Sequence, residues 1–182
     1  MIIGITGTNG AGKGAVVDYL TQKGFAHYSA RDFISAEIKK RGLALDRDSL
    51  RAVANDLRLT HSPAYVIESL FTEAKAAGGD AVIESVRAIG EANFLQKNGG
   101  VLVAVDADRA LRYDRIVRRG SATDKVDFAT WVAQEEREWA NADAWDMDIP
   151  GVMRLAEFTI QNDGTLEELH AQVDKILKQI KK

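Results

Sequence analysis

The sequence predicts an α/β protein in which one parallel β-sheet is covered by helices on both faces. Five short runs rich in apolar and β-branched residues alternate along the chain with segments of helical periodicity. The runs at 80–84 and 101–106 are apolar through their centres, as expected of strands that are covered on both faces. Parallel strands joined by helices require right-handed crossovers, which place helices on the two sides of the sheet.

Each element is expected from a local pattern and its flanking turn residues. The strands are expected at residues 2–6, 25–29, 80–84, 101–106 and 157–161. The helices are expected at residues 15–20, 32–41, 46–59, 63–77, 90–97, 109–119 and 128–140. A last helix follows the turn Asn162-Asp163-Gly164, because Thr165 and Glu168 have the spacing of a capping box.

Composition limits the organisation and the partners of the chain. With 182 residues and no break in composition, one domain over residues 1–182 is expected. The net charge of −3 gives no general attraction to nucleic acids or anionic membranes, and no apolar run reaches membrane-spanning length. The absence of cysteine fits a cytoplasmic protein. We therefore expect small-molecule substrates and neither nucleic acid nor membrane as a partner, and leave monomer and homodimer open.

The stretch Gly-Thr-Asn-Gly-Ala-Gly-Lys-Gly at residues 7–14 lies between the first strand and the first helix, which is the context of a P-loop. Its backbone N–H groups and the helix N-terminus would cradle the phosphates of a nucleotide, and Lys13 would reach the β- and γ-phosphates. The residues expected to bind this cofactor are Gly7, Asn9, Gly10, Ala11, Gly12, Lys13, Gly14 and Ala15.

One position of this motif departs from the usual pattern. Gly14 replaces the Ser or Thr whose hydroxyl ligates Mg²⁺, so no direct protein ligand for the metal is expected there. Capture of Mg²⁺ through water by Asp32, Glu84 or Asp106 is the expected alternative.

Ligands bind at the carboxyl ends of the strands in such sheets, and two polar residues follow the third strand there. Glu84 would bind a water on the metal or accept a proton from the substrate, unless it is a cap or surface carboxylate. Arg87 would hold the phosphate of an acceptor with its forked guanidinium, unless it is a solvated arginine.

Two helices add further candidates. Arg51, Asn55 and Arg58 recur on one face of the helix at 46–59, where they would hold a phosphate and a base edge or simply form a solvated face. In the helix at 109–119, the expected cationic face is formed by Arg112, Arg115, Arg118 and Arg119, opposite Ala110, Tyr113 and Val117.

This cationic face precedes a polar loop and would close over a transferring phosphoryl group, with Arg115 and Arg119 as the closing pair. A solvated helix and a nucleic-acid patch are the other interpretations. The tryptophans Trp131, Trp139 and Trp145 are expected to be packing residues.

The chain resembles small P-loop kinases of the nucleoside monophosphate kinase group, which includes adenylate kinase, dephospho-CoA kinase and deoxynucleoside monophosphate kinase. It is similar in particular to an archaeal-type set of adenylate-kinase-related proteins. Besides the P-loop, the matching stretches are Lys40-Arg41-Gly42-Leu43, Ala54-Asn55-Asp56-Leu57-Arg58, Val82-Ile83-Glu84-Ser85-Val86-Arg87, Arg115-Ile116-Val117-Arg118-Arg119-Gly120, Glu135-Glu136-Arg137-Glu138 and Asn162-Asp163-Gly164-Thr165.

The resemblance implies a P-loop NTPase fold, a three-layer αβα sandwich with strand order 2-3-1-4-5. It implies ATP as donor, Mg²⁺, an acceptor-binding helical insert at about 30–77 and a lid at about 112–145. It also places the base of ATP near Asn162, Asp163 and Gly164.

Two departures concern the acceptor. Adenylate kinases carry Asp-x-x-Arg after the second strand, but here Asp32 is followed by Phe33, Ile34 and Ser35. Arg31, Arg51 or Arg58 would then take the place of that arginine. The stretch Glu84-Ser85-Val86-Arg87 resembles deoxynucleoside monophosphate kinases, in which an acid and an arginine stand three residues apart.

The sequence therefore predicts an ATP- and Mg²⁺-dependent kinase that phosphorylates a nucleoside or deoxynucleoside monophosphate. Lys13, Glu84, Arg87, Arg115 and Arg119 are its expected catalytic residues, and Asp32 joins Arg31, Arg51, Asn55, Arg58 and Arg87 at the acceptor. Dephospho-CoA kinase is the alternative within this group. A nucleotide-dependent switch or partner-binding ATPase is the alternative of another class.

Overall fold

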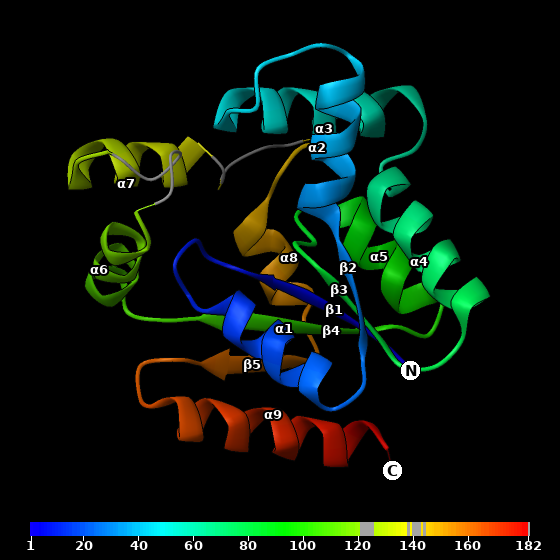
Figure 1. The fold of residues 1–182 in the computed structure, drawn as a ribbon, viewed down its shortest axis with the longest axis vertical. Helices are drawn as coiled ribbons and strands as arrows, with labels where there is room; N and C mark the ends of the chain where they lie inside the picture. Colours follow the sequence, from blue (N-terminus) through cyan, green and yellow to red (C-terminus); the bar gives the residue numbers. More distant parts are fainter. Residues whose placement is uncertain (121–125, 138, 140–142, 144, 182) are drawn as a thin grey trace.

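The computed structural model describes residues 1–120, 126–137, 139, 143 and 145–181 (Figure 1). A five-stranded sheet forms the centre of the molecule, in the order β2-β3-β1-β4-β5, and its neighbouring strands pair in parallel. The strands are β1 (Ile2–Gly7), β2 (Ala26–Ser29), β3 (Ala81–Glu84), β4 (Val101–Asp106) and β5 (Phe158–Gln161). The predicted α/β class and strand order 2-3-1-4-5 are confirmed.

Helices connect these strands. They are α1 (Lys13–Gln22), α2 (Ala30–Lys40), α3 (Arg47–Thr60), α4 (Tyr65–Ala77), α5 (Ile89–Lys97), α6 (Arg109–Arg119), α7 (Phe128–Arg137), α8 (Ile149–Leu155) and α9 (Leu166–Ile180). Helices α2, α3 and α4 lie between β2 and β3 in the chain, and α6, α7 and α8 lie between β4 and β5. In the part of the chain that is described, no helix has both the length and the apolar character needed to span a membrane.

Two apolar cores hold the helices on the sheet, because successive strand residues point to opposite faces. Ile3 and Ile5 of β1 pack with side chains of α1 and α9 on one face. Ile2 of β1 and Ile83 of β3 pack with α2, α3, α4, α5 and α8 on the other face. Figure 1 shows this division, with α1 and α9 on one side of the strands and α4 and α5 on another.

One helix was not expected from the sequence. Helix α8 is only seven residues long and contains Pro150 and Gly151, which do not favour a helix interior. Asp148 starts it, because its Oδ1 accepts a hydrogen bond of 2.8 Å from the backbone N–H of Gly151. Pro150 occupies the first turn, where a missing N–H leaves no helical bond broken.

The carboxyl ends of β1, β3 and β4 lie at one edge of the sheet, because these strands are parallel and adjacent. The P-loop follows β1, a short turn follows β3, and α6 follows β4 closely. Figure 1 shows α2 and α3 at the top of the view and α6 and α7 at the left, so both helical groups flank this edge.

Candidate functional site

The P-loop has a backbone that requires glycine at two central positions. Gly10 and Gly12 have φ values of 81° and 97°, in the left-handed region that other residues rarely adopt. Gly10 also lies against helix α6, since an added Cβ would meet the carbonyl oxygen of Arg112 at 2.5 Å. The loop is therefore shaped by its own glycines and packed against α6.

Helix α1 begins in this loop and offers its N-terminus to an anion. Gly12 caps the helix without a side chain, and the first turn, Lys13 to Val16, has no acidic residue. The Nζ atom of Lys13 donates hydrogen bonds of 2.7 Å to the carbonyl oxygens of Gly7 and Thr8. The lysine charge thus lies beside the loop, next to the positive end of the helix dipole, and this arrangement fits a nucleotide phosphate chain.

The turn after β5 braces the P-loop. The side-chain amide of Asn162 donates a hydrogen bond of 2.8 Å to the carbonyl oxygen of Ala11, and Asn162 is buried. Its backbone N–H donates to the carbonyl oxygen of Asp106 at the end of β4. Asn162, expected to bind cofactor, therefore has a clear structural role in joining β4, β5 and the loop.

Asp163 and Gly164 of the same turn are exposed. The carboxylate of Asp163 accepts a hydrogen bond of 2.7 Å from the backbone N–H of Asp108 and another from Gln161. These two donors, with the positive charge of Arg115, hold the pKa of the Asp163 carboxyl below its ordinary value. The Asp163 carboxylate therefore joins this turn to Asp108, which caps the start of α6.

Replacing Gly12 with alanine is expected to weaken ATP binding about tenfold and to cost about 1–2 kcal/mol of stability. The added Cβ would require a left-handed backbone and would meet the Asn162 amide that braces Ala11. The measurements are the ATP dissociation constant and the unfolding free energy. Gly99→Ala is the matched control, since its φ is 81° but its Cβ has no described neighbour within 4 Å. Unchanged ATP affinity in the Gly12 variant would contradict the role of the brace.

Three carboxylates were expected near a metal, and they lie in different settings. Asp106 accepts a hydrogen bond of 2.7 Å from the Thr8 hydroxyl and its side chain is 36% exposed. Glu84 accepts one of 2.9 Å from the Ser29 hydroxyl, and the Nε2 atom of His27 lies 3.7 Å away. Asp32 is exposed in the first turn of α2.

Among the described residues, no group of three or more His, Cys, Asp or Glu side chains forms a metal cage. Mg²⁺ in nucleotide sites usually takes one or two carboxylates together with substrate phosphates. Asp106 hydrogen-bonds directly to the P-loop residue Thr8, so its carboxylate fits such a role best.

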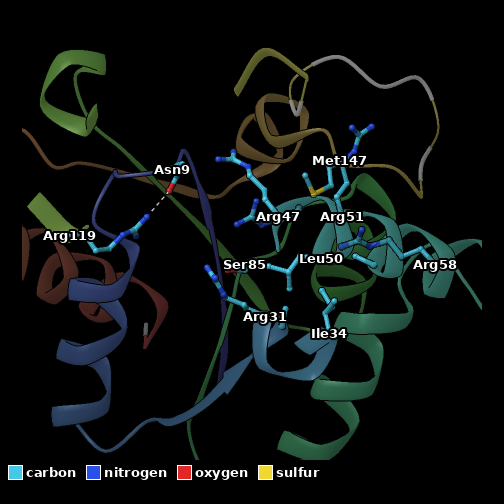
Figure 2. A pocket seen from close by; sticks show the side chains of 13 residues that line it. Asn9, Arg31, Ile34, Arg47, Leu50, Arg51, Arg58, Ser85, Arg119 and Met147 are labelled. Atoms are coloured by element: carbon cyan, nitrogen blue, oxygen red, sulfur yellow. Dashed lines mark hydrogen bonds between the residues drawn. The ribbon is translucent and has the colours of Figure 1, made fainter. Parts of the chain in front are cut away.

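An arginine-rich pocket lies beside the P-loop, with a volume of about 770 Å³ that includes space open to solvent (Figure 2). Its lining consists of Asn9, Ala30, Arg31, Ile34, Arg47, Leu50, Arg51, Ala54, Arg58, Ser85, Arg87, Arg119 and Met147. Six of these residues are arginines, and no acidic residue is among the lining residues in the described part of the chain. The pocket combines positive charge with an apolar wall, so it suits a ligand with an anionic and an apolar part.

The pocket brings together predicted residues from distant parts of the sequence. Asn9 comes from the P-loop, Arg31 from the start of α2, Arg87 from the turn after β3 and Arg119 from the end of α6. In Figure 2 the guanidinium of Arg119 points to Asn9, and its Nη2 donates a hydrogen bond of 3.4 Å to the Asn9 Oδ1. Lys13, Glu84, Arg115, Asp32 and Asn55 are not among the lining residues.

The predicted arginines of α3 lie at the pocket but have protein partners. Arg58 is 2% exposed, and its Nε donates a hydrogen bond of 2.7 Å to Glu91. Asn55 donates a hydrogen bond of 2.7 Å to Asp146, whose carboxylate also lies 3.9 Å from Arg51. Arg58 thus carries a buried ion pair, and Asn55 joins α3 to the segment before α8.

The predicted cationic face of α6 is wrong in two respects. Arg112 is 3% exposed, and its guanidinium bonds to the carbonyl oxygens of Ala107 and Asn9 and to the carboxylate of Glu135. Val117, expected on the covered side, is 54% exposed. The face of α6 that carries Arg112 and Ile116 is therefore buried, and Arg112 links the P-loop to α7.

The other arginines of α6 differ from one another. Arg118 and Arg119 are exposed at the helix end, and Arg119 reaches the pocket. The Nη1 atom of Arg115 is buried and has no hydrogen-bond partner among the described residues. The two residues expected to act as a closing pair therefore lie in different surroundings.

Of the three tryptophans, Trp131 supports the packing interpretation. Trp131 is 1% exposed and its ring contacts Tyr113, Phe128 and Arg112. The guanidinium carbon of Arg109 lies 5.1 Å from the ring centre of Trp139. Trp131 and the aromatic rings beside it join α6 to α7.

Sequence reasoning did not assign seven of the lining residues to the site, which are Ala30, Ile34, Arg47, Leu50, Ala54, Ser85 and Met147. Three of them differ in the signal that could have found them. Arg47 lies one helical turn before Arg51, so extending the arginine spacing of α3 backwards would have found it. Ser85 has a φ of 69°, in the left-handed region, and its residue type gives no signal of this. Met147 is buried and comes from a segment that the sequence analysis did not assign to any element.

Curated relatives match this chain over nearly its whole length. The chain is 27% identical over 183 residues to a UPF0200 protein of Pyrobaculum aerophilum, covering 99% of this chain and 98% of that protein. It is 29% identical over 187 residues to a UPF0200 protein of Thermococcus kodakarensis, with the same coverage of both chains.

Solved structures share the fold. A putative kinase from Chloroflexus aurantiacus has a TM-score of 0.63 at 20% identity, covering 99% of this chain and 95% of that one. Shikimate kinase from Acinetobacter baumannii, in complex with shikimate, has a TM-score of 0.59 at 17% identity, with 98% and 92% covered. A family described as an AAA domain matches residues 3–147, from the first strand to the pocket residue Met147. Since this match spans well over half of the sequence, the chain belongs to the AAA-domain family.

Proposed function

We propose that the protein is an ATP-dependent kinase that transfers the γ-phosphoryl group to an acceptor phosphate, on a nucleoside or deoxynucleoside monophosphate. The observation that carries the proposal is the position of Asn9. This residue belongs to the P-loop and also lines the arginine-rich pocket, where it accepts a hydrogen bond from Arg119. The end of a bound phosphate chain and a molecule in the pocket would therefore meet at one point.

The donor side rests on the loop and Lys13. The loop N–H groups and the Lys13 ammonium would hold the β- and γ-phosphates of ATP. Arg119 would neutralise charge that develops on the transferring group, because its guanidinium lies at the junction with the pocket. Mg²⁺ bound with the nucleotide would neutralise further phosphate charge, with Asp106, and also Glu84 or Asp32, as residues able to hold its water ligands.

The acceptor side rests on the pocket. Arg87 and Arg31 would hold the acceptor phosphate, and Ile34, Leu50 and Met147 would contact its less polar part. An oxygen of that phosphate would attack the γ-phosphorus while the bond to the β–γ bridging oxygen breaks, giving ADP and a diphosphate. Positioning and charge neutralisation would supply most of the rate enhancement.

A panel of acceptors tests the proposal. The purified protein is incubated with γ-labelled ATP, Mg²⁺ and each ribo- and deoxyribonucleoside monophosphate or dephospho-CoA, and the labelled products are identified. Label on an acceptor phosphate is the expected result. Label on the ribose hydroxyl of dephospho-CoA would assign the dephospho-CoA kinase reaction instead. ATP hydrolysis without transfer to any acceptor would overturn the proposal in favour of a switch or partner-binding ATPase.

A further inference from the structure

A buried ion pair joins α3 to α5 beside the arginine-rich pocket, because one of its members, Arg58, also lines the pocket. Arg58 of α3 and Glu91 of α5 are 2.7 Å apart, and their side chains are 1% and 0% exposed. Burying two charges costs free energy unless the geometry is good and the remaining polar atoms are bonded. Arg58 meets this condition in part through its Nη1 atom, which donates a hydrogen bond of 3.3 Å to the Asn55 Oδ1.

The second oxygen of Glu91 holds the backbone that carries Arg87. Its Oε2 accepts hydrogen bonds of 2.9 Å from the backbone N–H of Arg87 and 3.1 Å from that of Ala88. A carboxylate accepts hydrogen bonds only, so it matches the three donors of Arg58, Arg87 and Ala88. A glutamine amide in place of the Glu91 carboxylate would turn an NH₂ group, itself a hydrogen-bond donor, towards at least one of those donors.

The rest of this turn is fixed from other sides. The backbone N–H of Val86 donates to the carbonyl oxygen of Ile5 in β1, and that of Asp148 donates to the carbonyl oxygen of Arg87, both at 3.0 Å. Ser85 starts the turn with a φ of 69°, a conformation that costs free energy in a residue other than glycine and persists when neighbours enforce it. The backbone at Arg87 is therefore held by β1, by α5 and by the segment before α8.

We infer that Arg58 and Glu91 are positioning residues, which fix the turn so that the Arg87 guanidinium meets the acceptor phosphate. This inference rests on the proposed kinase function. Arg58 lines the pocket, but its charge is directed to Glu91, so it acts on the acceptor through Arg87. The pair lies on the acceptor side of the site, so its loss affects acceptor binding and the rate of transfer and leaves ATP binding unchanged.

Three variants separate positioning from general stability. Glu91→Gln keeps the size of the side chain and removes one acceptor oxygen. The double variant Arg58→Met, Glu91→Met replaces the pair with apolar side chains of similar length, so neither charge is left buried without its partner. Glu73→Gln is the matched control, because Glu73 is exposed on α4.

Both pair variants are expected to stay folded and to raise the KM for the acceptor about tenfold. The Tm of the double variant is expected to fall by a few degrees, because the backbone N–H groups of Arg87 and Ala88 lose their acceptor. The KM for ATP stays at the wild-type value. Hydrogen exchange of the Arg87 and Ala88 amides becomes faster in both variants, and Glu73→Gln changes none of these quantities. In an Arg87→Ala background, Glu91→Gln raises the acceptor KM no further, because the pair acts through Arg87.

Several results would overturn the inference. A folded double variant with wild-type acceptor KM would show that the pair is structural only. An additive effect of Glu91→Gln and Arg87→Ala would show that the pair acts elsewhere. If the wild-type protein transfers phosphate to no acceptor, the proposed function fails, and the exchange measurement then decides the inference alone. If the Arg87 and Ala88 amides of the pair variants then exchange as slowly as in the wild type, the inference is overturned. If they exchange faster, the ion pair does fix the backbone of the turn.

Discussion

Replacement of Lys13 by alanine is expected to reduce phosphoryl transfer by about 10³-fold while the protein stays folded. The Lys13 ammonium donates hydrogen bonds of 2.7 Å to the carbonyl oxygens of Gly7 and Thr8, so its charge lies at the mouth of the phosphate cradle. No other lysine lies in the P-loop sequence, and Gly14 and Ala15 add no hydroxyl group. Steady-state kinetics with the best acceptor measure the effect, and circular dichroism and Tm measure the fold.

Lys23→Ala is the matched control for this prediction. Lys23 caps the C-terminal end of α1, whereas the P-loop lies at the N-terminal end of this helix. It forms an ion pair of 2.8 Å with Asp174. Hydrogen bonding to the Asp174 carboxylate and to the Tyr19 side chain raises the pKa of Lys23, so it stays charged at neutral pH. The control is expected to retain wild-type turnover. If Lys13→Ala instead keeps wild-type turnover, the P-loop lysine takes no part in phosphoryl transfer and the prediction is wrong.

Much of the fold was predictable because its elements are encoded by local patterns. The strand Val101–Asp106 and the helix Arg109–Arg119 have the predicted bounds, since each is a strong pattern between clear turn residues. Thr165 and Glu168 form the predicted capping box at the start of α9. Helix α8 was missed because tertiary packing of Val152 and the cap at Asp148 support a segment with little intrinsic preference for helix.

The site was predictable where it depends on position along the chain, and not where it depends on a distant partner. Arg87 lies in the turn after β3, and Arg119 ends the helix that follows β4, so the order of strands in the sheet brings both to the same edge and into the pocket. Glu91 was not recognised, because nothing local indicates that it bonds Arg58 from 33 residues away. The place of Met147 in the pocket was missed for the same reason. The hydrogen bond from Asn55 to the neighbouring Asp146 joins residues that are 91 positions apart in the sequence.

The wrong face of α6 illustrates the same limit. An arginine is normally assigned to the solvent side of an amphipathic helix, but α6 is covered by the P-loop on one side and by α7 on another. The carbonyl oxygens of Ala107 and Asn9 and the carboxylate of Glu135 give the Arg112 guanidinium the partners that burial requires. The Trp131 ring lies over the same guanidinium, 5.2 Å from ring centre to Cζ.

Replacement of Glu135 by alanine is expected to lower the free energy of unfolding by about 3–5 kcal/mol. The side chains of Glu135 and Arg112 are 2% and 4% exposed, so the variant would leave a buried guanidinium without its carboxylate. For a chain of this size, such a loss corresponds to a fall in Tm on the order of 10 °C. Chemical denaturation and calorimetry measure the two quantities.

Two further variants decide whether this pair also supports the nucleotide site. Glu136→Ala, at the next position, is exposed and is expected to change stability by less than about 0.5 kcal/mol. The double variant Arg112→Met, Glu135→Leu removes both charges and is expected to recover most of the lost stability. It still lacks the hydrogen bond of 3.2 Å from Arg112 to the Asn9 carbonyl, so its ATP affinity is expected to stay below that of the wild type. If this double variant recovers stability and also has wild-type ATP affinity, the Arg112–Glu135 pair only holds α6 and α7 together and does not support the nucleotide site.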